Sequence, residues 1–499
     1  LVGSVRCVKE TGKIFMSTST SSTAKRPKLM GTVVAVGLML FSMFFGAGNL
    51  IFPPMLGVES GENFTPAMIG FLLTGVLMPV VTVIAVAISG AGVRDLASRA
   101  GALFGLIFAI VAYLSIGALY AVPRAAAIGY ELGVESTFDL SGGWWRLAGT
   151  FAFFLICFLL TLWPGKVVDN LGKILTPILL ILLAVLAVIG LQKLSNPSIP
   201  ATEEYASNPL ISGISQGYFT MDSIAALAFA LIVVSSFSQK GESDHGRIVK
   251  LSAVAAGTAG FFLMLVYLGL GLVGARMPDK ESYSDGAALL SSAAHLTMGN
   301  AGEFVFSMIV LLACITTVVG LTAATSTFFH ELIPAISYRW WATILTLIGL
   351  LISNLGLERI LNVSGPVIGL IYPPAIILIA LSYVHLLFQK YKLVFAYRIG
   401  VIVAFMFSFI DFLAALNLPV DALQDALSWI PLMDAGMGWL LPTLILTAIG
   451  LAIDLSRKVP NDEDEEVDFE ALDPFTATVD DEDGTAGASD TSEAHTSRS

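Results

Sequence analysis

The sequence predicts an all-α integral membrane protein. Of its 499 residues, 56% are hydrophobic and only 13% are charged, a balance far from that of soluble domains. Apolar stretches of roughly 17 to 25 residues recur along the chain, which is the length a helix needs to cross a hydrocarbon core of about 30 Å. Alternating segments of about ten residues, the pattern of a membrane barrel, are absent. The spans are therefore expected to be helical.

Twelve spans account for the apolar stretches. Those near residues 147 and 340 are short and the one near 358 is long, so eleven is the alternative count. The expected spans are residues 31–56, 66–89, 102–123, 147–164, 171–191, 213–237, 249–273, 302–328, 340–354, 358–386, 398–416 and 437–455.

The spans form one transmembrane domain, residues 30–458, between two tails that we expect to be disordered. Residues 1–29 are largely polar, and residues 459–499 are acidic. From Asn461 onward there are fourteen acidic residues against Arg498, so the formal net charge of −12 originates in this tail. The tail either solvates the terminus or makes a regulatory contact. Lipid is an expected partner of the chain and nucleic acid is not.

The charges between the spans predict the orientation, because Lys and Arg concentrate on the cytoplasmic side. With the amino terminus inside, sixteen basic residues fall in inner segments and six in outer loops. Both termini are therefore expected in the cytoplasm. The six outer residues are Arg124, Arg146, Lys193, Arg276, Lys280 and Arg359.

The first span contains a helix-breaking sequence, FSMFFGAGNLIFPP, from Phe41 to Pro54. Unpaired backbone groups are costly in lipid, so an unwound stretch persists only where protein, water or a ligand satisfies it. Gly46 and Gly48 ease the departure from helical angles, and Asn49 adds a side-chain amide. Such a break offers half-helix ends to a cation and a carboxylate. The alternative is a small-residue packing face.

The sixth span carries polar residues near its start, in GYFTMDSIAALAFA from Gly217 to Ala230. An ionisable residue inside a span, here Asp222, marks a functional site by default. Spans one and six enter the membrane from opposite sides, so residues of about 30–191 and 213–386 are expected to form two inverted repeats of five helices. Helices one and six are then the discontinuous pair, and residues 398–455 add two peripheral helices. Alternatively, Asp222 reaches an aqueous cavity near the outer face.

The eighth span places two hydroxyls side by side in ACITTVVGLTAATSTFF, from Ala313 to Phe329. Thr316 and Thr317 supply hard oxygen ligands of the kind a small cation prefers. Threonines in membrane helices also bond back to their own carbonyls, which is the structural alternative.

These segments resemble one known family, the bacterial branched-chain amino acid:cation symporters. The resemblance rests on GLMLFSMFFGAGNLIFPPMLG, GYFTMDSIAAL, PRAAAIGYELG from Pro123, and LACITTVVGLTAATSTFF from Leu312, in matching order between about Met30 and Lys458. The family is similar in turn to symporters of the leucine-transporter fold, whose first span carries GxGNxxxFP. The string here, GAGNLIFP, is one residue shorter between Asn49 and Pro53, so Gly46, Gly48 and Asn49 are the positions that match.

The resemblance implies a site as well as a fold. The substrate would lie against the two breaks, its carboxylate facing N–H groups of the first and its ammonium facing carbonyls of both, with apolar contact from the sixth span. One sodium ion would use Asn49 and Thr220, and a second would lie between carbonyls of the first span and hydroxyls of the eighth. The implied substrate residues are Gly46, Ala47, Gly48, Asn49, Phe219, Thr220, Met221, Asp222, Ala225 and Ala226. The implied ion ligands are Ser42, Phe45, Thr316, Thr317, Asn49 and Thr220.

The expected function is secondary active transport of leucine, isoleucine and valine into a bacterial cell across the plasma membrane, driven by sodium as the coupling ion, with no cofactor. Two alternatives stay open, proton coupling with Asp222 as the titrating group and a passive facilitator or channel. An enzyme is not expected, because HELIP from His330 lacks the second histidine of a zinc-protease helix.

Overall fold

The computed structural model describes residues 29–90, 92–135, 142–163, 168–194, 200–277, 283, 285–433 and 436–460. Its regular structure in these ranges is helical, with one isolated β bridge between Tyr391 and Pro460. The first helix begins at Leu29. The expected tails fall almost entirely outside the described residues, as do the loop residues between these ranges.

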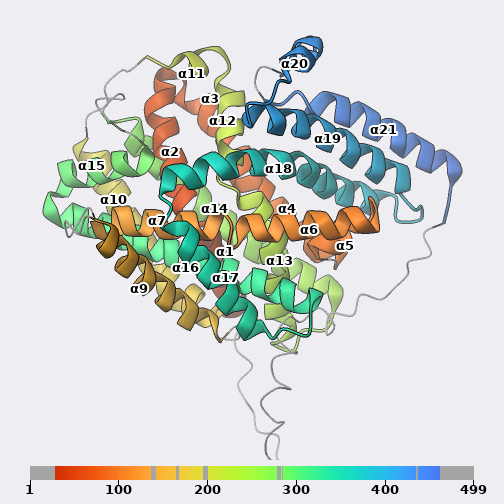
Figure 1. Cartoon of the computed structure of the whole chain (residues 1–499). Coiled ribbons are helices and arrows are strands. Elements are labelled where there is room, and N and C mark those ends of the chain that lie inside the picture. Colours follow the sequence, from red (N-terminus) through yellow and green to blue (C-terminus); the bar gives the residue numbers. More distant parts are fainter. Residues whose placement is uncertain are drawn as a thin grey trace, which may run out of the picture.

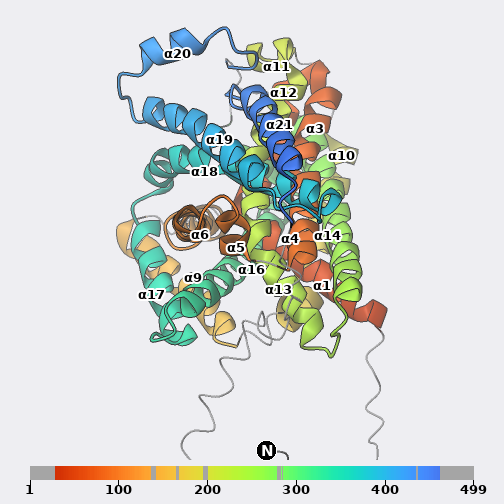
Figure 2. The ribbon, with the colours of Figure 1, turned by 90° about the vertical axis from the view of Figure 1, so that its right-hand side faces the viewer.

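Helices of very different lengths build the molecule, as Figures 1 and 2 show. Several are interrupted, and the pieces carry separate labels. The first half comprises α1 (Leu29–Phe44), α2 (Ala47–Ser60), α3 (Phe64–Leu72), α4 (Met78–Ser89), α5 (Val93–Ser98), α6 (Ala102–Ile116), α7 (Ala121–Tyr130), α9 (Gly143–Thr161) and α10 (Thr176–Lys193). The second comprises α11 (Glu203–Ser207), α12 (Pro209–Tyr218), α13 (Asp222–Ser238), α14 (His245–Gly274), α15 (Gly286–Met298), α16 (Asn300–Leu332), α17 (Tyr338–Ser353), α18 (Leu357–Leu387), α19 (Val394–Ala415), α20 (Asp421–Leu427) and α21 (Leu440–Arg457).

Each of the twelve expected spans coincides with a helix or an interrupted helix, although the count of twelve is not confirmed. Among the described residues, nine helices are long and apolar enough to cross a membrane, and the bent pair α12 and α13 makes ten. The segments Met30–Phe44 and Tyr338–Ser353 are apolar but shorter. The predicted all-α membrane architecture is therefore correct.

The third span differs most from its expected course. We expected one helix over residues 102–123 with Arg124 in the following loop, but α6 ends at Ile116 and α7 begins at Ala121. A Cβ at Gly117 would lie 2.8 Å from Oγ1 of Thr325 in α16, so this turn packs tightly against a neighbouring helix. Arg124 consequently lies inside a helix and is 5% exposed. The expected outer-loop position of Arg124 is wrong.

The helices divide into a buried centre and a lipid-exposed periphery. In the most apolar 18-residue stretch of α16, 67% is buried inside the protein. The corresponding share for α21 is 17%. Figures 1 and 2 show α19 and α21 side by side at one edge, beyond α18. Asp454 of α21 is buried and accepts hydrogen bonds from the backbone N–H groups of Phe395 (3.1 Å) and Ala396 (2.8 Å). This carboxylate caps the amino-terminal end of α19 and joins the two peripheral helices.

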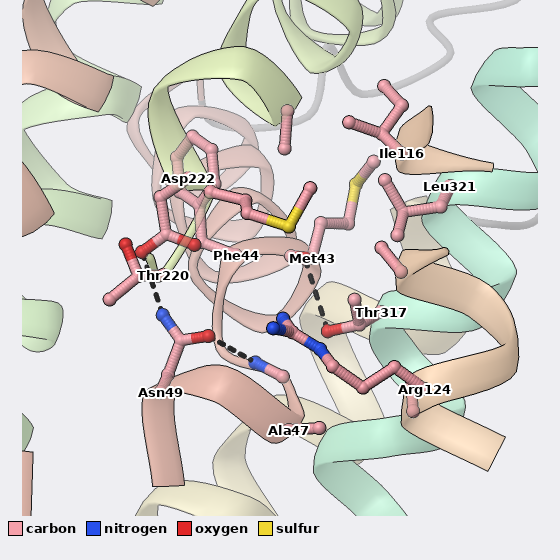
Figure 3. Close-up of a pocket in the computed structure, with 15 residues that line it drawn as sticks. Met43, Phe44, Ala47, Asn49, Ile116, Arg124, Thr220, Asp222, Thr317 and Leu321 are labelled. Carbon is pink, nitrogen blue, oxygen red and sulfur yellow. Dashed lines mark hydrogen bonds between the residues drawn. The ribbon is translucent and has the colours of Figure 1, made fainter. Parts of the chain in front are cut away.

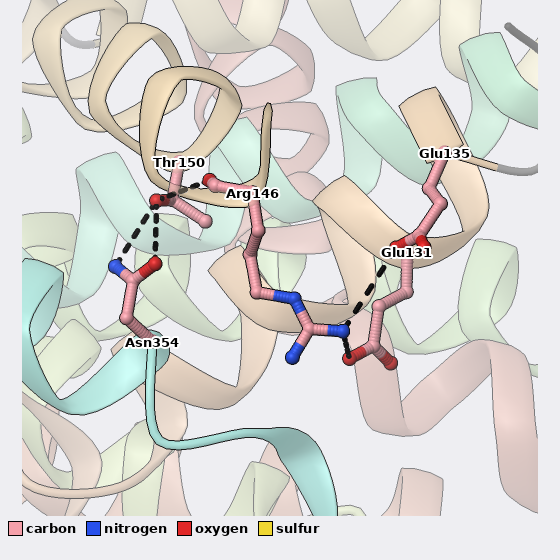
Figure 4. Close-up of polar contacts among 5 residues, drawn as sticks. All are labelled: Glu131, Glu135, Arg146, Thr150 and Asn354. Atoms are coloured by element: carbon pink, nitrogen blue, oxygen red, sulfur yellow. Dashed lines mark hydrogen bonds and ion pairs between the residues drawn. The ribbon is translucent and has the colours of Figure 1, made fainter. Parts of the chain in front are cut away.

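A partly exposed polar cluster connects the end of the third span with α9 and α17 (Figure 4). Arg146 of α9 lies 3.3 Å from a Glu131 carboxylate oxygen and 3.9 Å from one of Glu135. In the same helix Thr150 accepts a hydrogen bond from the Asn354 amide at 3.1 Å. Ion pairs at this exposure contribute little to stability, roughly 0–1 kcal/mol. Arg146 is thus an arginine whose guanidinium is paired with two carboxylates of the protein.

Glycines allow α12, the first half of the interrupted sixth span, to pack closely on α3. A Cβ at Gly213 would lie 1.9 Å from the Ala67 carbonyl oxygen, and one at Gly70 would lie 2.1 Å from that of Leu210. Thr74 also donates a hydrogen bond to the Ile214 carbonyl at 2.9 Å. Small residues at such interfaces let the backbones approach. This contact fixes the position of the chain just before the break at Phe219–Met221.

Replacing Gly213 with alanine tests this packing. The added methyl group has no space, so α12 must move away from α3, at a cost of about 1–3 kcal/mol. We expect a lower melting temperature of the purified protein in detergent than for Gly257→Ala, whose Cβ meets nothing within 4 Å. Equal melting temperatures for the two variants would contradict the assigned role of Gly213.

Candidate functional site

The first span is interrupted between Phe44 and Ala47, as expected. Gly46 has extended backbone angles (φ −118°, ψ −159°), and its N–H donates to Oδ1 of Asn49 at 3.1 Å. A Cβ at Gly46 would lie 2.7 Å from Oγ1 of Thr317 in α16, so glycine is needed for this approach. The side chain of Asn49 thereby satisfies one of the backbone groups that the break exposes.

The sixth span is also interrupted, between Tyr218 and Asp222, and its two halves are bent by 45°. Met221, the residue before α13, has a positive φ of 68°. A non-glycine residue in this region costs on the order of 1–3 kcal/mol and is typical of functional sites. Asp222 begins α13 and is 2% exposed.

Three side chains join the two interruptions. Nδ2 of Asn49 donates to Oδ2 of Asp222 at 2.7 Å, and the Tyr267 hydroxyl of α14 donates to the same oxygen at 2.8 Å. The Asn49 amide also donates to the Tyr267 hydroxyl. All three residues are buried. A buried carboxylate in such a network is held in place, because loss of either donor leaves its charge less compensated.

A pocket lies between the two breaks, and Figure 3 shows its lining. Its free volume is about 30 Å³, room for about one water molecule. An amino acid therefore enters only if the lining side chains move. Eight of the expected residues line it: Gly46, Ala47, Asn49, Thr220, Met221, Asp222, Ala225 and Thr317. The other lining residues are Met43, Phe44, Ile116, Ala121, Arg124, Ala125 and Leu321.

Three expected substrate residues lie outside this lining. Gly48 is buried in the first turn of α2 beside the guanidinium of Arg124, to which a Cβ on it would be 2.9 Å distant. Ala226 is completely buried in α13. Phe219 is 44% exposed and stacks on Phe52 of α2, with ring centroids 6.1 Å apart.

Oxygen atoms gather where the end of α1 meets α16. The hydroxyl of Thr316 lies 2.9 Å from the Ser42 carbonyl oxygen, and that of Thr317 lies 3.2 Å from the Met43 carbonyl and 3.4 Å from that of Ser42. Thr316 also bonds back to Leu312 and Ala313 in its own helix, which was the structural alternative. The Thr316 hydroxyl thus contacts both α1 and its own helix, whereas the hydroxyl of Thr317 is directed at α1.

The remaining expected ion ligands occupy different surroundings. The Ser42 hydroxyl donates to the Met39 carbonyl within α1, and Phe45 is fully buried with its ring stacked on Phe41. Thr220 lines the pocket and donates to the Gly217 carbonyl at 2.9 Å. Oδ1 of Asn49 faces the Gly46 N–H, while its amide nitrogen faces Asp222.

Two residues that sequence reasoning missed belong to the site. Tyr267 is a single tyrosine in an apolar span, and no sequence pattern links it to Asp222. Arg124 was assigned to a loop because the third span was ended too early. The signal for Arg124 was present in PRAAAIGYELG, where no other charged residue follows the arginine until Glu131.

Comparisons with solved structures agree with this architecture. Mhp1, a nucleobase-cation-symport-1 family transporter, matches with a TM-score of 0.56 at 13% identity, covering 89% of this chain and 96% of that one. A manganese transporter mutant of Eremococcus coleocola matches with a TM-score of 0.54 at 16% identity, covering 85% and 96%. At such identities the likeness establishes the fold alone, which is that of the leucine-transporter-like carriers.

Sequence comparisons identify the family. A family model of branched-chain amino acid transport proteins matches residues 30–457. The branched-chain amino acid permease BrnQ of Corynebacterium glutamicum is 44% identical over 427 residues, 86% of this chain and 96% of the permease. The permease BraB of Bacillus subtilis is 36% identical over 428 residues, 85% and 95% of the two chains. This multi-pass membrane protein therefore belongs to the branched-chain amino acid transport protein family.

Proposed function

We propose that the chain is a sodium-coupled symporter that carries leucine, isoleucine and valine into the cell, with both termini in the cytoplasm. The observation that carries the proposal is the meeting of two interrupted spans at one buried pocket, where Asn49 bonds to Asp222 at 2.7 Å. Broken helices facing each other in this way are how transporters of many folds build a substrate site within the membrane. The names of the relatives support the choice of substrate.

The pocket offers different surroundings to the two ends of an amino acid. The first turn of α2 presents backbone N–H groups that suit a carboxylate, and the break before α13 presents carbonyls and the Asp222 carboxylate to an ammonium group. Met43, Phe44, Ile116 and Leu321 supply apolar contact for an aliphatic side chain. Methionine adapts its shape readily, so Met43 can yield when the substrate enters.

Sodium binding is proposed where the end of α1 meets α16. Two carbonyl oxygens of α1 lie 2.9–3.4 Å from two threonine hydroxyls of α16, close enough for one cation to contact all four. Hard oxygen ligands are what small cations prefer. A cation there would tie the interrupted span to α16, so that ion and substrate favour the same arrangement of the helices. Coupling of this kind is typically worth about 1–3 kcal/mol.

Proton coupling is the second candidate, and the burial of Asp222 favours it. In that mechanism Asp222 carries the proton, and a sodium gradient has no effect. A passive facilitator would equilibrate leucine without accumulating it.

Uptake of radiolabelled leucine, isoleucine and valine into proteoliposomes, under an imposed sodium or proton gradient, separates sodium coupling, proton coupling and passive transport. We expect accumulation above the external concentration with sodium alone; accumulation driven only by protons would overturn the sodium assignment.

Substitutions at the ion ligands should raise the sodium concentration needed for half-maximal uptake. Thr317→Val removes a hydroxyl of the proposed ion site, and Asn49→Ala removes the amide that the family resemblance assigns, with Thr220, to a second ion. Each change should cost roughly 1–2 kcal/mol, or about five- to thirty-fold. Thr161→Val is the matched control, since this buried threonine bonds within α9, away from the pocket. Unchanged sodium dependence in both site variants would remove Thr317 and Asn49 as ligands.

Asp222→Asn tests whether the charge at the sixth-span break is needed. The asparagine oxygen can still accept from Asn49 and Tyr267, so the fold should persist while the negative charge is lost. We expect the KM for leucine to rise by about ten-fold or more, since hydrogen bonds to charged groups are worth about 1.5–3 kcal/mol. Asp411→Asn, in the peripheral helix α19, is the control. Equal KM values for the two variants would exclude Asp222 from substrate binding.

A further inference from the structure

Arg124 is a buried cation at the pocket, and the proposed function above does not use it. The residue belongs to α7, which begins after the turn that interrupts the third span. It is 5% exposed and lines the pocket together with Asn49, Asp222 and Thr317. Figure 3 shows its side chain reaching into the pocket from the side opposite Asp222. An intramembrane charge of this kind is conspicuous because burying it is costly.

The guanidinium has few partners within the protein. Nη1 donates to the Tyr120 hydroxyl at 2.8 Å, and the group lies over the Tyr120 ring, 4.8 Å from its centroid. Nε is buried and has no hydrogen-bond partner. Within the described part of the chain, no carboxylate lies within ion-pair distance of Arg124, in contrast to Arg146 with its two glutamates. A guanidinium with five N–H donors is therefore left largely unpaired.

The first turn of α2 adds further donors at the same place. Nη2 of Arg124 lies so close to Gly48 that a Cβ there would be 2.9 Å from it. The N–H groups of this first turn lack intrahelical partners, and helix amino termini favour anions. Gly48 is thus the residue whose missing side chain lets the cation approach the helix end. The guanidinium and the helix end together form a site for a planar anion.

The opposite charge lies across the pocket. Asp222 is held by Asn49 and Tyr267 and makes no ion pair with Arg124, although both line the same cavity. An acidic and a basic group that line one pocket without forming an ion pair match a molecule that carries both charges. A zwitterionic α-amino acid has its carboxylate and ammonium on one carbon atom and would satisfy both ends.

We propose that Arg124 binds the substrate carboxylate, with the first turn of α2 beside it, so that the pocket selects α-amino acids by their paired charges. This proposal rests on the function proposed above and deepens it. A bidentate guanidinium–carboxylate contact would satisfy the donors that the protein leaves unpaired. Leucinol is the diagnostic probe, because it keeps the ammonium group and the side chain of leucine but has a hydroxymethyl group instead of the carboxylate.

The test measures binding of leucine and leucinol to the purified full-length chain in sodium buffer, for wild type and Arg124→Gln. Wild type should bind leucine at least about thirty-fold more tightly than leucinol, and Arg124→Gln should lose most of that preference by weakening leucine binding alone. Arg124→Lys keeps the charge without the fork and should be intermediate. Arg99→Gln is the matched control, because Arg99 also bonds to a tyrosine hydroxyl, that of Tyr397, away from the pocket.

The outcomes separate the two proposals. If wild type binds leucine and Arg124→Gln or Arg124→Lys keeps the full preference for leucine over leucinol, the role of Arg124 is overturned while the transport function stands. If wild type binds no leucine, the proposed function fails, and the role of Arg124 fails with it. Should Arg124→Gln not fold, as judged by its melting temperature, the Arg124→Lys comparison decides.

Discussion

The side chain of Asn49 holds the two interrupted spans together, and the site depends on that connection. Its oxygen accepts the Gly46 N–H at the first break, and its nitrogen donates to Asp222 at the second. Exposed backbone groups within a membrane persist only when something satisfies them. Asn49 does this at the first break and carries the contact on to the second, so each interruption is stabilised by the presence of the other. Tyr267 of α14 completes the network from a third helix.

The surrounding packing explains why these breaks stay in register. Because glycine has no side chain, Thr317 of α16 can approach Gly46, the backbone of α3 can approach Gly213, and Arg124 can approach Gly48. Each of these close approaches fixes one side of the pocket on a neighbouring helix. The broken segments are therefore held by neighbouring helices on several sides, which allows a strained residue such as Met221 to persist at the second break. Substrate and ion would act on the few residues that are not fixed in this way.

The sequence predicts the spans and the two breaks because their signals are local. Apolar length marks a span, and glycines beside an asparagine, or an aspartate inside an apolar run, mark an interruption. The buried position of Arg124 was not predicted, because its signal is not local. Its position depends on a turn at residues 117–120 that is made by packing of Gly117 on Thr325, far away in sequence. A few residues of error in a span end, which is common, moved a buried cation into a predicted loop.

Tyr267 and the direction of the Asn49 amide were beyond sequence reasoning for a related reason. Which face of α14 meets the breaks is decided by the packing of several helices, so one tyrosine in an apolar span carries no mark of its partner. The resemblance assigned the Asn49 side chain to an ion without fixing its orientation. In the structure the side-chain oxygen serves the Gly46 N–H, and the amide nitrogen serves Asp222. A functional role for Asn49 could be predicted from its place at the first break. The orientation of its amide could not, because it depends on Asp222 at the second break.

The division between charged and apolar parts of the pocket suggests how selectivity would arise. Fixed charges discriminate strongly, because a ligand lacking a matching group leaves a buried charge unpaired. Apolar walls discriminate weakly, since one methylene is worth only about 1–3 kcal/mol. With a free volume of about 30 Å³, the pocket admits an amino acid only if lining residues move, and Met43 is of the type that adapts its shape readily. A pocket built in this way would demand an α-amino acid while accepting leucine, isoleucine and valine with similar affinity.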